Sequence, residues 1–129
     1  MPGEFPTLVP ALVMHELNEL AAEATSLGDK LAKAQRNFEP AERAYDDFVT
    51  SFVAGLWQKH LDGEIKRMPG EDIRLALAHK AIPPETYGQY LAWKQSIARL
   101  EQALRANRTA IDAKRSVLSA LKLEQEAVR

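Results

Sequence analysis

Apolar residues recur along the first half of the chain at alternating spacings of three and four, which is the pattern of a coiled-coil helix. One set of positions, seven residues apart, is Leu17, Ala24, Leu31, Phe38, Tyr45 and Phe52. The companion set is Leu20, Leu27, Ala34, Ala41 and Phe48. Together the two sets form a first heptad seam, and they predict one long helix over residues 11–61.

Two residues within this range disfavour a helix. Gly28 costs roughly 1 kcal/mol relative to alanine in a helix interior. Pro40 has no backbone N–H, so it either kinks a helix or splits it. The apolar spacing continues past Pro40 without a change of phase, which favours a helix that is kinked near Pro40 over two separate helices.

A second heptad seam runs along the last third of the chain and predicts a helix over residues 84–127. Its positions are Ile97, Leu104, Ile111 and Leu118, with the companions Trp93, Leu100, Asn107, Lys114 and Leu121. An asparagine at such a position often fixes the register between two helices, and we expect this of Asn107. Lys114 is expected to lay its aliphatic stem along the seam and to keep its ammonium group in water.

Shorter segments surround the two long helices. Residues 1–10 contain three prolines and predict an extended arm, and residues 62–70 are rich in turn-forming residues. Residues 71–80 predict a short helix, which ends before Pro83 because a residue that precedes proline is disfavoured in a helix. We therefore predict an all-α fold in a single domain over residues 1–129. It is an elongated, coiled-coil-like antiparallel helical hairpin, with the short helix at its tip.

A DNA-binding helix-turn-helix is an alternative interpretation of the segment LALAHKAIPPETYGQYLAWK. Residues 71–80 would be the first helix and residues 84–94 the second. The chain offers no third helix to support such a unit, and Glu85 would repel phosphate at the start of the reading helix. We therefore favour a short helix that folds over the end of the hairpin. In that arrangement Ile73, Leu77, Ile82 and Tyr87 are expected to pack on Phe52, Leu56, Trp57 and Trp93.

Composition limits the chemistry that the chain can support. Cysteine is absent, which excludes disulfides and thiolate metal sites, and no segment reads as a signal peptide or a membrane span. We therefore expect a cytoplasmic protein. The three histidines, His15, His60 and His79, are far apart in the sequence and offer no metal-ligand pair. The sequence thus predicts no catalytic, cofactor-binding or metal-binding residues, and it predicts that the protein is not an enzyme.

Charge is distributed unevenly although the formal net charge is only -1, because residues 1–62 are acidic and residues 91–129 are basic. A basic face of the last helix comprises Arg105, Arg108, Arg115 and Lys122. This face either pairs within the hairpin with acidic residues of the first helix (Glu23, Asp29 or Glu42) or binds nucleic acid or another acidic partner. Glu101 and Asp112 interrupt the face and no aromatic residue lies on it, which weakens the nucleic-acid interpretation.

Aromatic and apolar residues gather where the sequence places the tip of the hairpin. Side chains of this type serve as anchors in protein interfaces. We predict a protein-binding surface there made of Trp57, Ile82, Tyr87, Tyr90 and Trp93. Association of several copies into a four-helix assembly would also bury more of the two seams.

The run SIARLEQALRANRTAIDAKRSVLSALKLEQE, preceded by AERAYDDFVTSFVAG, resembles small helical accessory proteins of actinobacterial and related phages. The resemblance covers roughly residues 41–126 and implies a phage origin and an accessory role near replication and recombination, without implying any active-site residue. The N-terminal arm and the proline-containing segment 63–84 depart from that pattern. The predicted function is therefore that of a non-enzymatic phage accessory protein in the host cytoplasm. It would bind either a recombination or replication protein, or a host defence nuclease that it inhibits. The alternatives are a nucleic-acid-binding module and a structural or oligomeric scaffold.

Overall fold

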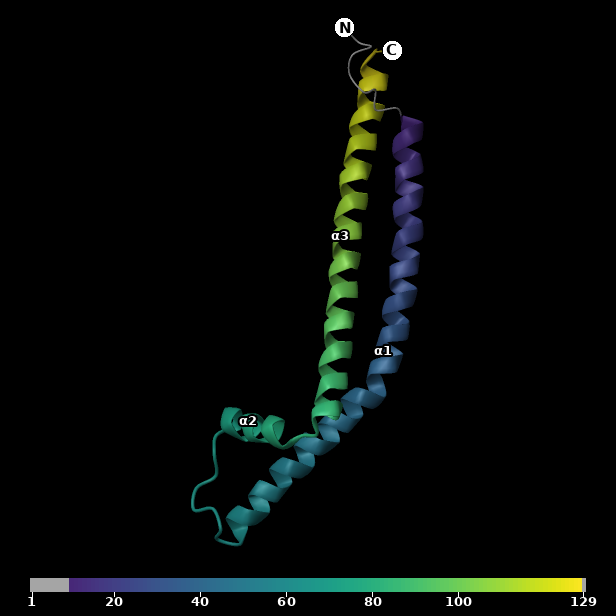
Figure 1. The fold of residues 1–129 in the computed structure, drawn as a ribbon. Helices are drawn as coiled ribbons and strands as arrows, with labels where there is room; N and C mark the ends of the chain where they lie inside the picture. Colours follow the sequence, from purple (N-terminus) through teal and green to yellow (C-terminus); the bar gives the residue numbers. More distant parts are fainter. Residues whose placement is uncertain (1–9, 129) are drawn as a thin grey trace. The chain divides into compact units, whose positions relative to one another are not determined.

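The computed structural model describes residues 10–128, and these form three α-helices joined by short connections, with no strand among them (Figure 1). Helix α1 spans Pro10–Leu61, α2 spans Glu71–Ala81 and α3 spans Pro84–Val128. The predicted all-α class is therefore confirmed. Residues 1–9 of the predicted N-terminal arm lie outside the described part of the chain.

The chain divides into two compact units, and both long helices run through both of them. In unit 1, residues 10–32 of α1 lie antiparallel to residues 98–128 of α3 (Figure 1). Unit 2 comprises residues 33–97, which are the remainder of α1, all of α2 and the first turns of α3. Within each unit α1 packs against α3, as predicted for a hairpin.

Both predicted seams face the partner helix. Every seam residue is buried or half-buried. Two helices cannot enclose a seam completely, so most of these side chains keep some contact with solvent. The buried apolar residues among those described are few: Val13, Ala34, Leu56, Ala78, Ile82 and Leu118.

Helix α1 continues through Pro40 as a single α-helix, so the proline does not split it. Gly63, two residues after the last helical residue Leu61, adopts the left-handed region with φ of 80°. The amide of Gly63 donates to the carbonyl oxygen of His60 at 3.2 Å, and the amide of Glu64 donates to that of Lys59 at 2.9 Å. These two bonds form a Schellman motif, which satisfies carbonyl groups that the last helical turn would otherwise leave unpaired.

Helix α2 packs through one side only. Its covered side carries Arg74, Ala78 and Ile82, which are four residues apart, and Ala78 has 0% of its surface exposed. The prediction that Ile73 and Leu77 pack inward was wrong, because they are 58% and 38% exposed. The orientation of α2 could not be predicted from the sequence, because apolar and charged residues alternate around the helix and its periodicity does not single out one face.

No helix within residues 10–128 carries a stretch long and apolar enough to cross a lipid bilayer.

Candidate functional site

A cluster of aromatic rings joins the three helices in unit 2. It contains Tyr45 from α1, His79 from α2, and Tyr87 and Tyr90 from α3, and these four residues are named here the tyrosine–histidine cluster. The rings of Tyr45 and Tyr90 stack with centroids 3.8 Å apart and an interplanar angle of 7°. Because all four side chains are half-buried, the cluster fastens α2 to the two long helices more than it presents an open surface.

His79 lies between two tyrosine hydroxyl groups. The hydroxyl of Tyr45 is 2.5 Å from Nε2 of His79, and the hydroxyl of Tyr87 is 3.3 Å from Nδ1. A neutral imidazole carries one N–H and one acceptor nitrogen. In either neutral tautomer, therefore, one tyrosine can donate to His79 while the other accepts from it, and both ring nitrogens of this half-buried histidine have partners.

Lys94 extends from α3 to the exposed edge of this cluster. Its ammonium group donates to the Tyr90 hydroxyl at 3.3 Å and lies 5.3 Å from the centroid of the Tyr90 ring. The hydrogen bond to Tyr90 raises the pKa of the Lys94 ammonium above its usual 10.5. Burial raises the pKa of the Tyr45 hydroxyl above its usual 10.0, and the neighbouring Tyr90 and Tyr87 raise it further.

Arg74 fastens α2 to the end of α1. Its guanidinium donates to the carbonyl oxygen of Pro69 at 2.8 Å and lies 5.9 Å from the centroid of the Trp57 ring. The contact with Trp57 is a cation–π interaction, and it leaves the tryptophan 46% exposed. Beside Arg74 a shallow groove of about 220 Å³ separates α1 from α2, with Val49 and Val53 on one wall and Leu75 on the other.

Among the described residues, the side of α2 away from Ala78 is largely exposed. The exposed residues there are Asp72, Ile73, Ala76, Leu77 and Lys80, which form the outer face of α2. In an α-helix successive residues are 100° apart, which places these five side chains within one broad arc. The outer face is therefore mainly apolar, with an acidic residue at one end and a basic residue at the other.

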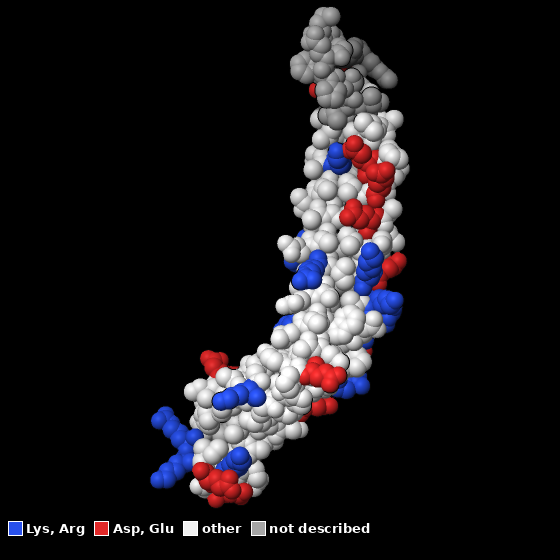
Figure 2. Space-filling model, in the orientation of Figure 1, with Lys and Arg blue, Asp and Glu red and all other residues white. Residues whose placement is uncertain are grey.

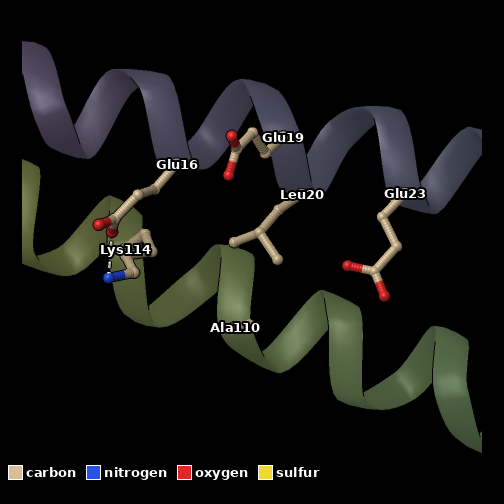
Figure 3. A pocket seen from close by; sticks show the side chains of 6 residues that line it. All are labelled: Glu16, Glu19, Leu20, Glu23, Ala110 and Lys114. Atoms are coloured by element: carbon tan, nitrogen blue, oxygen red, sulfur yellow. Dashed lines mark ion pairs between the residues drawn. The ribbon is translucent and has the colours of Figure 1, made fainter.

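Unit 1 contains a groove of about 310 Å³ between α1 and α3, shown in Figure 3. Three glutamates of α1 line it, Glu16, Glu19 and Glu23, and α3 contributes Ala110 and Lys114. The Lys114 ammonium pairs with Glu16, whose Oε2 atom is shielded from solvent. The Lys114 side chain keeps 37% of its surface exposed, so the expectation that its ammonium reaches water stays a prediction. Figure 2 shows the acidic side chains gathered over the first turns of α1.

The basic face predicted on α3 is exposed. Arg105, Arg108, Arg115 and Lys122 all lie at the surface of unit 1, and the ion pairs found in residues 10–128 include none of them. The expected pairing of these residues with Glu23, Asp29 or Glu42 is therefore not observed in that part of the chain. The ion pair that does join α1 to α3 uses Lys114, which belongs to the seam.

The five residues predicted at the tip do not form one surface. Ile82 is buried, with 4% exposure, and supports the fold. Tyr87 and Tyr90 belong to the tyrosine–histidine cluster, Trp93 is half-buried on α3, and Trp57 lies beneath Arg74. Tyr45 and His79 were not predicted as members of a site. Tyr45 has the spacing of an ordinary seam residue, and nothing in the sequence spacing places His79 beside it.

Comparison of the chain with known protein families, with curated proteins and with solved structures found no match. The resemblance to phage accessory proteins therefore stays a prediction. Residues 10–128 contain no group of three or more histidine, aspartate or glutamate side chains placed to hold a metal ion.

Proposed function

We propose that this chain acts by binding a protein through exposed apolar side chains of unit 2. The observation that carries the proposal is the position of those side chains. Of the nine large apolar residues that are exposed in the described part of the chain, three lie in unit 1 (Leu12, Met14 and Leu123) and six in unit 2: Trp57, Leu61, Ile73, Leu75, Leu77 and Leu91. Three of the six belong to the 11 residues of α2. Exposed apolar side chains that lie together mark protein interaction sites, and the three on α2 are close in sequence on one helix.

The exposed residues suit this role better than the tyrosines. Substitution of Tyr87 or Tyr90 would loosen the attachment of α2, so a loss of binding would be confounded with a loss of structure. Leu61 is 77% exposed at the end of α1, and Ile73 is 58% exposed on α2. Substitution of either residue changes the surface without opening a cavity in the core. The phage origin and the lack of catalytic activity stay predictions from the sequence.

The experiment is affinity capture with the full chain as bait in a lysate of the cells that express it, followed by mass spectrometry. The variants are Leu61→Glu and Ile73→Glu, and the matched control is Leu123→Glu, since Leu123 is 66% exposed but lies on α3 in unit 1. We expect the wild type and the control to capture the same proteins, and at least one unit 2 variant to lose them. Capture of the same proteins by all four baits would refute the proposal.

A second candidate function is nucleic-acid binding by the basic face of α3. It is supported by the exposure of Arg105, Arg108, Arg115 and Lys122 and by the lack of an ion-pair partner for any of them within residues 10–128. A gel shift at low salt with the wild type, lost in Arg108→Glu/Arg115→Glu, would favour it, because phosphate contacts weaken as salt rises. Absence of any shift at low salt would remove it.

A further inference from the structure

The outer face of α2 has the properties of an incomplete interface. Ile73 and Leu77 are 58% and 38% exposed, whereas Ala78 on the opposite side of the helix is completely covered. Ile73, Leu75 and Leu77 place three large apolar side chains with exposed surfaces within this 11-residue helix. The helix is also only 11 residues long, so it depends on packing for its stability. These observations leave Ile73 and Leu77 available for contact with a second surface.

The order of charges along α2 identifies the kind of surface that fits. Glu71 and Asp72 lie in the first turn, and His79 and Lys80 lie in the last turn. An antiparallel copy of the same helix would bring its basic end to the acidic end of this one, and the reverse at the other end. Such a pairing also sets the two helix dipoles in opposite directions, which is favourable.

Ala76 marks the centre of this arrangement. It lies four residues after Asp72 and four before Lys80, so a two-fold axis beside Ala76 would place each Asp72 opposite Lys80 of the second copy. Its small side chain allows the two helices to approach closely at the crossing point. Ile73 and Leu77 would then pack against their counterparts on both sides of the axis.

We propose that the outer face of α2 binds the outer face of α2 in a second copy of this chain, antiparallel and across a two-fold axis. The inference rests on the proposed function, because it names the partner for part of the apolar surface of unit 2. The helix is about 16 Å long, so it offers much less than the roughly 800 Å² per partner of a stable interface. The dimer is therefore weak and forms only as the protein concentration rises.

The test is sedimentation equilibrium of the full chain over a wide range of protein concentration at low salt. The wild type is expected to approach twice its monomer mass of 14.4 kDa at high concentration. Ile73→Glu should weaken association at least about tenfold, since it places a charge where an apolar side chain is buried. Leu123→Glu, an equally exposed position in unit 1, should associate as the wild type does.

A charge exchange tests the antiparallel register. Asp72→Lys and Lys80→Glu should each weaken the dimer, because each sets like charges against each other across the axis. The double variant Asp72→Lys/Lys80→Glu should restore association, because the opposite pairs are formed again with their signs exchanged. Circular dichroism on every variant shows whether the helices are retained. Failure of the double variant to restore association would overturn the register.

Two results would overturn the inference as a whole: a wild type that stays at 14.4 kDa at every concentration, or a dimer that Ile73→Glu leaves intact. These results are separate from those of the capture experiment. A strictly monomeric chain whose capture of other proteins is lost in Ile73→Glu would leave the proposed function standing and remove this inference alone. If the double variant restores the dimer but the chain captures no other protein, this inference stands, and binding to a different protein is refuted.

Discussion

Asn107 is the buried polar residue of the seam in unit 1. It is 6% exposed, and its side-chain amide donates to the backbone carbonyl oxygen of Leu20 at 3.0 Å. This bond joins α3 to α1 at one defined register, which is the role that the heptad pattern predicts for an asparagine. We expect Asn107→Ala to lower the free energy of unfolding by about 1 kcal/mol, through loss of the hydrogen bond. Urea denaturation followed by circular dichroism measures this change.

The matched variant is Asn107→Leu, which fills the seam with an apolar side chain. Its free energy of unfolding should equal or exceed that of the wild type. A buried asparagine in a heptad seam lowers stability relative to an apolar residue, and its hydrogen bond contributes only a modest net free energy. If leucine destabilises the chain as much as alanine does, the shape of the space around residue 107 determines the stability, and the hydrogen bond does not.

The raised pKa of Tyr45 predicts a loss of stability in alkaline solution. The folded state holds the Tyr45 proton more tightly than the unfolded state, in which the hydroxyl ionises near 10. The contribution of Tyr45 is therefore fully present below about pH 10 and is lost as the pH rises through the higher pKa of the folded state. Lys94, whose pKa is also raised, adds a loss of the same sign in the same region.

The measurement compares the wild type with Tyr45→Phe by denaturant unfolding at a series of alkaline pH values. The wild type should lose stability more steeply than the variant as the pH rises above about 10, because phenylalanine has no proton to release. Absorbance of tyrosinate gives a second readout, since the chain has three tyrosines and all of them belong to the cluster. Equal steepness in both proteins would contradict the prediction.

At the scale of the element, Gly28 within α1 and Gly63 just after its end have opposite roles. A Cβ atom at Gly28 would meet no atom within 4 Å, so alanine should stabilise the helix there by about 0.5 to 1 kcal/mol. Gly63 adopts φ of 80° in the Schellman motif. Alanine at that position should cost about 1 kcal/mol, because a Cβ atom disfavours the left-handed region.

Thermal unfolding of Gly28→Ala and Gly63→Ala under identical conditions tests this pair. The two midpoints should move in opposite directions from that of the wild type. A rise in both would mean that the turn after α1 does not need its left-handed residue. A fall in both would mean that Gly28 is required for close packing.

The two long helices were predictable because their signal is repeated many times. Each seam position is one of a series, so a single exception such as Asn107 or Pro40 does not hide the period. Helix α2 was predictable as a helix but not in its orientation. Its apolar residues occupy every side, and only the fold shows that Ala78 faces inward while Ile73 faces out. The tyrosine–histidine cluster could not be predicted, since it depends on which residue of α2 meets Tyr45.

At the scale of the whole molecule, the chain keeps its acidic and basic residues apart although its net charge is near zero. In unit 1, Glu16 and Glu23 line the groove with Ala110, on one side of the α3 seam. Arg108 and Arg115 follow the seam on its other side, since positions that flank a heptad seam at e and g diverge. This separation explains why the pairing expected from the sequence is not seen in the described residues.

The separation makes a prediction about stability. Arg108→Glu/Arg115→Glu should change the free energy of unfolding by less than about 0.5 kcal/mol, because both arginines are exposed and neither has an ion-pair partner within residues 10–128. Lys114→Glu should cost about 1 kcal/mol, because it removes the partner of Glu16 and sets a second carboxylate beside it in a half-buried position. Lys114→Gln, which removes the charge without reversing it, should fall between Lys114→Glu and the wild type.

Urea unfolding at low and high salt distinguishes these cases. The cost of Lys114→Glu should shrink as salt screens the two carboxylates, whereas the double arginine variant should stay close to the wild type at both salt concentrations. If the double variant were the less stable of the two, Arg108 and Arg115 would be paired within the chain after all. The basic face would then no longer be free for an acidic partner. Stability alone can therefore decide between the two interpretations of this face, before any ligand is known.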